Sequence, residues 1–334
     1  MDQHISIQEG SRSEDSDNHM LWMGSKVKEH TGRIVEIRSL LPNFYVKPFA
    51  IYSAGNCVIN PNLYTVVQTP ANQNEMEMPI GVVSKKYKLI QHYEVFDVAV
   101  NAMRSIGIDT ELVEAKLTIT EFGERMALSF LFPEDESYSF SIDENGDNMR
   151  LRLQCFNSVE GSARFIAFLG WYRLVCSNGL MVGIAKLDFR KRHCIGWEID
   201  DIGEVLSVGL SVITEEVELY RDWQQKELVL ESIRQWVDGP LKDKWGVKLA
   251  ARTFHIIRTG MDAKFAKPFE KGWPSEKTME PTRKVPGTPQ EVHNAFDVSQ
   301  VLSWLAKERN DVQQQIELMR DIPHMMDSLI GKVR

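Results

Sequence analysis

Residues 149–156 read Met-Arg-Leu-Arg-Leu-Gln-Cys-Phe, and apolar and polar residues alternate along this stretch up to its last position. A period of two places successive side chains on opposite faces of a β-strand. One face carries Met149, Leu151, Leu153 and Cys155, and the other carries Arg150, Arg152 and Gln154. The stretch therefore predicts a strand whose first face packs in a core and whose second face meets solvent or a ligand.

The neighbouring sequence supplies the rest of a sheet and its helices. Further strands are expected over residues 115–122, 125–132 and 164–176. Apolar residues spaced by three and four predict helices over residues 93–106 and 202–237, the second ended by Gly239-Pro240. More helices close the chain. This order predicts an α+β fold, an antiparallel β-sheet meander with a long helix packed on it, plus C-terminal helices.

The chain divides by composition into four segments. Residues 1–20 have the make-up of a disordered acidic tail, and residues 21–78 are β-rich, with short strands and turns expected from Arg33 to Val67. Residues 79–240 form the expected central α+β core domain. Residues 241–334 form a basic loop and C-terminal helical region, in which the proline-rich stretch 271–289 is expected to be a mobile loop.

Charge is distributed unevenly along the 334 residues. The whole chain carries a formal net charge of -8, yet the stretch Met149 to His193 sets eight basic residues against two acidic ones. The negative total argues against coating duplex DNA through overall charge, but it leaves room for a local basic groove. No run reaches the roughly 18 apolar residues of a membrane-spanning helix. The N-terminus also lacks a signal-peptide pattern, so a cytoplasmic protein is expected.

Residues that could support catalysis form no recognisable constellation. The four cysteines, Cys57, Cys155, Cys176 and Cys194, are widely separated, which predicts neither a disulfide framework nor a zinc site. Cys176 and His193 lack a third orienting group. The acidic pairs Asp200-Asp201 and Glu215-Glu216 fit a solvated helix face better than a metal-dependent nuclease. The sequence thus predicts no enzyme, no cofactor and no metal.

The basic stretch is the best candidate for a binding surface. The residues expected to neutralise phosphates are Arg150, Arg152, Arg164, Arg173, Arg190, Lys191 and Arg192. The rings expected to stack on bases are Trp171, Tyr172 and Phe189. A bulge at Gly170 would let Arg164 and Arg173 share a surface. The alternative is an ordinary solvated sheet face, whose arginines cover apolar neighbours and whose aromatic rings belong to the core.

Three motifs carry a resemblance to a known family. They are Val83-Ser84-Lys85-Lys86-Tyr87-Lys88 with Gln91, then Cys155-Phe156-Asn157-Ser158 with Gly161-Ser162, then Arg173-Leu174-Val175-Cys176-Ser177-Asn178. Together they resemble the uncharacterised family of phage/plasmid-like proteins (domain of unknown function 932) over about residues 79–305. The resemblance implies a phage, prophage or plasmid setting and brings no catalytic residues. The expected order of elements is also similar to single-strand annealing proteins of the Rad-fifty-two type, which implies a DNA groove beside the sheet and a ring of subunits.

Two functions follow as hypotheses. The first is a phage- or plasmid-encoded, homo-oligomeric protein that binds single-stranded DNA, or RNA, and anneals DNA strands in recombination or replication. The second is a non-enzymatic interaction protein that sequesters or inhibits a host defence factor through its acidic faces. Neither hypothesis needs a membrane partner.

Overall fold

The computed structural model describes residues 26–70, 72, 76–141, 148–173, 180–182, 188–191, 193, 214–265, 278–289, 292–309 and 312–331. The chain forms two compact units, each assembled from three stretches. Unit 1 comprises residues 1–138, 151–169 and 186–211. Unit 2 comprises residues 139–150, 170–185 and 212–334. The acidic tail over residues 1–20 and the Asn145-Gly146 turn lie outside the described residues.

The main sheet is antiparallel wherever its register is defined. Its strands follow the order β1 (Val27–Arg33), β5 (Glu114–Thr120), β6 (Arg125–Leu131), β8 (Asn148–Ser158), β9 (Phe165–Arg173) and β10 (Leu180–Val182). Two short strands, β7 (Ser139–Ser141) and β11 (Asp188–Lys191), pair with β8 and β9. The expected α+β class, with antiparallel sheets and C-terminal helices, is confirmed. The strands expected over residues 115–132 and 149–156 are found with shifts of one or two residues at their ends.

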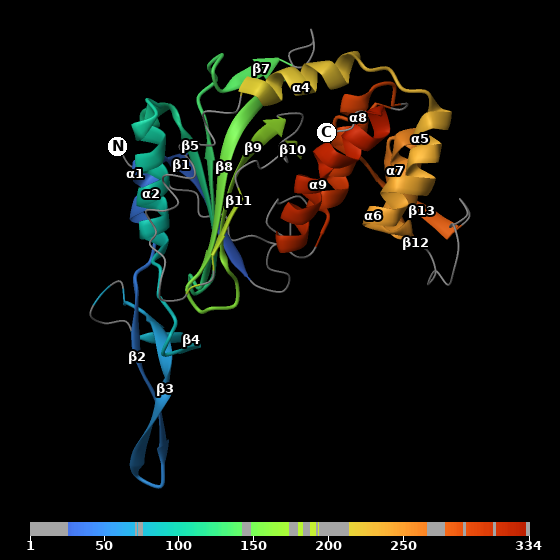
Figure 1. The fold of residues 1–334 in the computed structure, drawn as a ribbon. Coiled ribbons are helices and arrows are strands. Elements are labelled where there is room, and N and C mark those ends of the chain that lie inside the picture. Colours follow the sequence, from blue (N-terminus) through green and yellow to red (C-terminus); the bar gives the residue numbers. More distant parts are fainter. Residues whose placement is uncertain are drawn as a thin grey trace. The chain divides into compact units, whose positions relative to one another are not determined.

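Helix α2 (His92–Ser105) covers one face of this sheet in unit 1, as Figure 1 shows. Its buried face includes Phe96, whose ring meets that of Phe130 on β6 at 5.5 Å in an edge-on arrangement. Leu128 and Leu153, on the same sheet face as Phe130, are almost completely buried. Fully burying one such side chain contributes about 1.5–3 kcal/mol. The alternation that begins at Met149 therefore has its expected apolar side in a core.

The polar side chains on the opposite face of the same strands are buried, which differs from the expectation of solvent or a ligand. Arg152 is only 7 % exposed, and its Nε donates a hydrogen bond to Ser129 Oγ on β6. Gln154 and Thr118 are buried on the same face. Alternation distinguishes the two faces of a strand, but it does not reveal whether the polar face is covered.

The N-terminal region departs further from expectation. Residues expected to begin a strand form the short helix α1 (Ile34–Ser39), and Glu36 accepts a hydrogen bond from the Arg33 backbone nitrogen at 3.0 Å. This contact satisfies a backbone donor at the helix start, so local capping outweighs the β-propensity of Ile34 and Val35.

A long hairpin follows in place of the expected short strands. Strands β2 (Phe44–Ser53) and β3 (Asn56–Gln68) run antiparallel to each other, and β4 (Met78–Ser84) pairs only with the inner part of β3, from Leu63 to Gln68. Pro48 does not end β2, because a register shift between Pro48 and Ala50 accommodates its missing N–H. We call residues 44–68 the arm, and Figure 1 shows its two strands continuing beyond β4.

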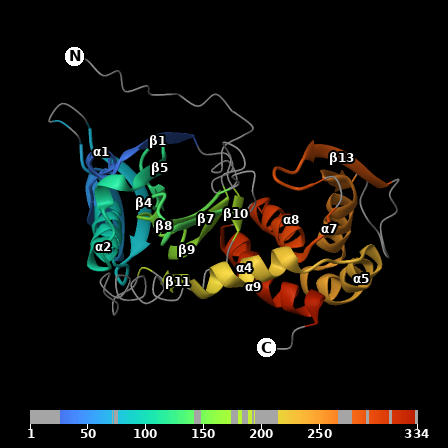
Figure 2. The ribbon, with the colours of Figure 1, turned by 90° about the horizontal axis from the view of Figure 1, so that it is seen from above.

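Unit 2 is mainly helical. Its helices are α4 (Thr214–Gln225), α5 (Leu230–Trp236), α6 (Lys242–Trp245), α7 (Val247–Thr259), α8 (Ala295–Lys307) and α9 (Val312–Ile330). Helix α8 packs against α4, α7 and α9, and α5 packs against α9 (Figure 2). The ring of Tyr220 on α4 meets Phe140 of β7 and Phe296 of α8. This aromatic cluster joins the short strand to the helices.

The prediction of a single helix over residues 202–237 is wrong for the part of this range that the structure describes. Helix α4 ends at Gln225 and a separate helix, α5, begins at Leu230. Gly239-Pro240 also does not end the helical run, because a π-turn (Val237–Leu241) leads directly into α6. Proline has no N–H to donate, and the wider turn tolerates it within the run.

The proline-rich stretch expected to be a loop is partly a strand. Strand β13 (Met279–Lys284) pairs antiparallel with β12 (Met261–Phe265), whereas residues 266–277 lie outside the described residues. Pro281 lies opposite Ala263, next to a register shift in this two-stranded sheet. A proline is accepted on such an edge because half of the backbone donors there face away from the partner strand.

A buried carboxylate organises this side of unit 2. Asp262 accepts hydrogen bonds from Arg252 Nε at 3.0 Å, Arg252 Nη2 at 2.6 Å and Trp304 Nε1 at 2.9 Å. The Asp262 side chain is 4 % exposed and that of Arg252 is 20 % exposed. The pair thereby links β12, α7 and α8.

Replacing Asp262 with alanine should destabilise the protein by about 3–5 kcal/mol, because Arg252 would keep a largely buried charge without its partner. The control is Glu280→Ala, which breaks the exposed Lys264–Glu280 pair of the same two-stranded sheet and should cost less than about 1 kcal/mol. Urea unfolding of both variants measures the difference. Equal losses would contradict the central role of Asp262.

Candidate functional site

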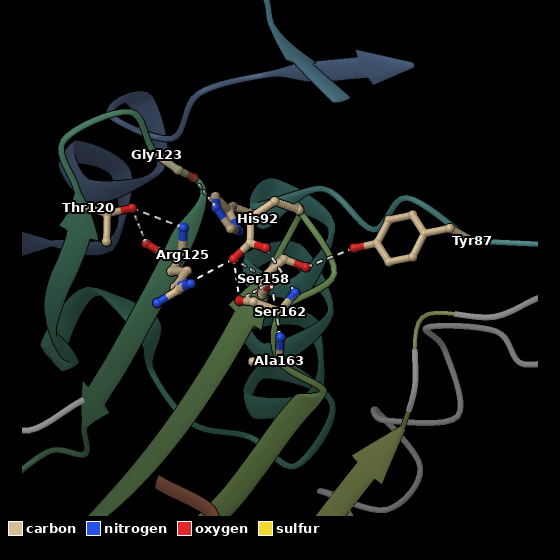
Figure 3. Close-up of polar contacts among 9 residues, drawn as sticks. Tyr87, His92, Thr120, Gly123, Arg125, Ser158, Ser162 and Ala163 are labelled. Atoms are coloured by element: carbon tan, nitrogen blue, oxygen red, sulfur yellow. Dashed lines mark hydrogen bonds and ion pairs between the residues drawn. The ribbon is translucent and has the colours of Figure 1, made fainter. Parts of the chain in front are cut away.

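Two of the family-like motifs meet at one end of unit 1. Tyr87, in the loop between β4 and α2, donates its hydroxyl to the backbone carbonyl of Ser158 at 2.9 Å (Figure 3). The backbone nitrogen of Lys88 donates to the carbonyl of His193 at 3.3 Å, and the rings of Tyr87 and His193 stack at 5.2 Å. Segments from three distant parts of the sequence are therefore held together through the 85–91 loop.

The connection between β8 and β9, residues 159–164, is shaped by Glu160. Its carboxylate accepts hydrogen bonds from Arg125 Nε at 2.8 Å, from the Ser162 backbone nitrogen at 2.9 Å and from Ser162 Oγ. Gly161 has a φ of 85°, and a Cβ there would lie 3.4 Å from both Tyr87 and Val83. The positive φ is the reason for glycine at this position, since a Cβ would make only ordinary van der Waals contact with these two side chains.

A buried histidine fixes the start of α2. His92 Nε2 lies 2.7 Å from the carbonyl oxygen of Gly123, and His92 Nδ1 lies 3.0 Å from the Asn157 amide nitrogen. Asn157 also donates to the Ile90 carbonyl at 3.0 Å. Because a carbonyl only accepts and the amide nitrogen only donates, the neutral ring carries its proton on Nε2. Burial lowers the pKa of His92 to about 4, so the ring is uncharged at neutral pH.

Gln91 attaches the arm to the start of α2, next to His92. Its Oε1 accepts from the Phe44 backbone nitrogen at 3.0 Å, and its Nε2 donates to the Phe44 carbonyl at 2.7 Å. The side-chain amide thus bonds Phe44 as a neighbouring β-strand would. The Phe44 ring also meets His92 edge-on at 5.5 Å. One short stretch, from Ile90 to His92, therefore contacts the arm, β8 and the β5–β6 turn.

Basic residues collect around this junction. Lys85, Lys86 and Arg164 are exposed and take part in no ion pair within the described part of the chain, and Lys88 is half-buried. The backbone of Lys191 pairs with Phe165, directly after Arg164, and that of Arg190 pairs with Ile166. We call these residues the basic edge: Lys85, Lys86, Lys88, Arg164, Arg190 and Lys191. The nearby carboxylate of Glu160 already pairs with Arg125.

The structure divides the residues expected to form the binding surface. Arg164, Arg190 and Lys191 belong to unit 1, at the junction just described. Arg150 and Tyr172 belong to unit 2 and are half-buried. The side chains of Phe189, Arg190 and Lys191, and the whole of Arg192, lie outside what the structure describes.

Three expected contact residues are not accessible, which corrects the sequence interpretation. Arg152 is buried against Ser129, as described above. Arg173 is 6 % exposed, donates from Nη1 to the Gly287 carbonyl at 3.0 Å, and lies over the Phe296 ring. Trp171 is 1 % exposed and meets Phe140 edge-on. The alternative interpretation describes these residues better. Trp171 belongs to the core, and Arg152 and Arg173 form hydrogen bonds within the protein.

Sequence reasoning missed Lys85 and Lys86 as surface residues. Both stand in the first family-like motif, but the count of basic residues began at Met149, about sixty positions later. Only the fold reveals that the two stretches meet. The signal was the short basic run itself, Lys85-Lys86-Tyr87-Lys88, placed just before a predicted helix.

The structure also places the possible metal ligands and two of the four cysteines. Within them, no group of three His, Cys, Asp or Glu side chains is arranged to hold a metal ion. Cys155 is buried, and burial raises the pKa of its thiol to about 12, so it carries no thiolate at neutral pH. Cys57 is exposed on the arm. Cys176, Cys194 and Asp200-Asp201 lie outside the described residues, as do the side chains of Glu215-Glu216.

Fold and site together define a two-unit α+β protein in which two of the three family-like motifs meet at a junction within unit 1. The chain belongs to the family described as Domain of unknown function (DUF932), whose profile matches residues 79–321. No curated protein and no solved structure matches the chain, so nothing supports the similarity to annealing proteins of the Rad-fifty-two type. Among the described residues, no helix has the length and apolar character needed to cross a membrane.

The neutral state of His92 predicts a stability that depends on pH. The unfolded chain gains a proton on this ring near pH 6.5, whereas the folded chain gains it only near pH 4. Stability is therefore fully present above about pH 6.5 and falls as the pH drops toward 4. Between about pH 7.5 and pH 5 this ring alone should account for a loss of about 2 kcal/mol. Burial lowers the pKa of His193 to about 4 as well, and its effect has the same sign.

Urea unfolding at the two pH values tests this. The His92→Gln variant should lose less stability on acidification than the wild type, by about 2 kcal/mol. His324→Gln, at an exposed position on α9, is the control and should keep the wild-type pH dependence. An unchanged pH dependence in His92→Gln would show that folding does not lower the pKa of this ring.

Proposed function

We propose that this protein binds single-stranded nucleic acid along the basic edge of unit 1. The observation that carries the proposal is the junction itself, which brings Lys85, Lys86 and Arg164 from separate parts of the sequence to one end of unit 1. Exposed lysine and arginine side chains bind phosphates without needing a fixed sequence. Arg190 and Lys191 extend the same set along the neighbouring strand.

Charge placement supports a local site. With a net charge of -8, the protein as a whole repels a polyanion, so binding depends on a region where positive charge is concentrated. The carboxylate of Glu160 at the junction is occupied by Arg125 and by Ser162, which limits its repulsion of phosphates. In this proposal the buried side chains of Arg152, Arg173 and Trp171 do not contact the nucleic acid. They stabilise the fold instead.

No chemical step is required for this function. Holding a strand by its phosphates leaves the bases accessible for pairing, and we therefore extend the proposal to annealing of complementary DNA strands in recombination or replication. RNA would bind the same phosphate-directed site. A phage or plasmid setting, implied by the resemblance of the motifs, fits this role.

Polarisation of a fluorescent oligothymidine of about 20 nucleotides tests the site at two salt concentrations. Affinity should fall steeply with added salt, because each phosphate contact releases counterions. Arg164→Glu should weaken binding at least about tenfold and reduce the slope of log K against log salt by about 0.7, the value of one lost contact.

Arg104→Glu is the matched control, since it makes the same charge change at an exposed position. Arg104 lies twelve residues after His92 on α2, about 18 Å along the helix. Equal weakening by both variants would mean that total charge, not the basic edge, controls binding. Binding that ignores salt and both substitutions would overturn the proposal.

A further inference from the structure

The outer part of the arm is a bare two-stranded ribbon. Strand β4 covers β3 only from Leu63 inward, so residues 49–62 have no third strand within the described part of the chain. Ile51, Val58 and Ile59 are 53 %, 54 % and 59 % exposed, and Tyr52 is 84 % exposed. An isolated two-stranded hairpin is at best marginally stable in water, and unpaired strand edges are ready templates for another strand.

Both faces of this ribbon carry apolar side chains. Ile51 lies opposite Val58 on one face, and Tyr52 lies opposite Cys57 on the other. A ribbon that used one face to pack on its own domain would be apolar on that face only. Apolar groups on both faces are instead typical of a strand pair that becomes part of a wider sheet.

The arm also lacks charge beyond Lys47. The 27 residues from Pro48 to Asn74 contain no Asp, Glu, Lys, Arg or His. This composition offers nothing to phosphates or to an oppositely charged protein surface. It suits a second copy of the same chain, because two molecules of net charge -8 repel least where they meet through uncharged segments.

We infer that the arm is a self-association element, in which the free edge of β3 pairs with the same edge of β3 in a second copy. Such a contact has two-fold symmetry, and antiparallel strands satisfy it directly. The result is a four-stranded sheet of two arms. This inference is independent of nucleic-acid binding.

The hairpin turn determines which backbone groups of β3 can bond to a second copy. Ser53 and Asn56 flank the two-residue turn Ala54-Gly55, in which both residues have positive φ. Flanking residues of such a turn bond to each other, so the backbone groups of Cys57 and Ile59 point outward from the ribbon. The proposed register pairs Cys57 with Ile59 of the second copy, so that Val58 lies next to the two-fold axis, opposite its own image.

Light scattering after size exclusion, over about two decades of protein concentration and without nucleic acid, measures the association. The wild type should reach twice the monomer mass. Val58→Lys, which sets two like charges opposite each other, should raise the dissociation constant at least about tenfold. Val58→Glu should act likewise, and an equimolar mixture of the two variants should recover the dimer. Because Val58 is exposed, circular dichroism should be unchanged.

Leu112→Lys is the matched control, since Leu112 is 63 % exposed and lies outside the arm, and it should leave the mass unchanged. A wild type that stays monomeric overturns the inference, and a different protein then becomes the candidate occupant of the arm. A dimer that survives Val58→Lys overturns it too.

Crosslinking tests the register. In the Cys57→Ser background, Val58→Cys should form an intermolecular disulfide on mild oxidation, because directly opposed positions lie within the roughly 4.4–6.8 Å Cα separation of a disulfide. Native Cys57 should not, because its image is displaced by two residues along the strand. Crosslinking through Cys57 but not through position 58 would overturn this arrangement.

Discussion

The neutral imidazole of His92, held between the Gly123 carbonyl and the Asn157 amide, is the contact on which the rest of unit 1 depends. It attaches the start of α2 to the end of β8 without a buried charge. Gln91, one residue earlier, bonds both backbone groups of Phe44. The direction of the arm, the path of the lysine-bearing loop and the packing of α2 on the sheet are thus set within three consecutive residues. Every partner of these contacts is neutral, so added salt does not weaken them by screening.

In unit 2, charged groups rather than neutral ones connect the helices and strands. Asp262 accepts hydrogen bonds from the guanidinium of Arg252 and from the indole N–H of Trp304. These bonds connect the β12–β13 sheet to helices α7 and α8. Arg173 has a similar role, with its guanidinium over Phe296 and bonded to the Gly287 carbonyl. Buried arginines here are structural connectors. An arginine-rich sequence is therefore a poor guide to a binding surface unless the burial of each side chain is known.

Local patterns predicted the elements well and their surroundings less well. The alternation from Met149 to Cys155 and the spacing of Phe96, Val100 and Met103 identified β8 and α2 within about two residues. Burial of the polar face at Arg152 was not predictable, because it depends on chain segments far away in sequence. Ile34 and Val35 became helical because Glu36 caps the Arg33 backbone nitrogen, a three-residue effect that outweighs strand propensity. The junction was visible only as separate motifs, since Tyr87 and Ser158 are brought together by tertiary folding alone.

The uncharged stretch from Pro48 to Asn74 has a consequence for how ionic conditions act on this protein. Salts that are excluded from protein surfaces strengthen apolar contacts, while dissolved ions of any kind screen lysine and arginine. Raising the concentration of such an excluded salt therefore acts with opposite sign on the arm and on the basic edge. A single solution variable can separate the two surfaces without altering a residue.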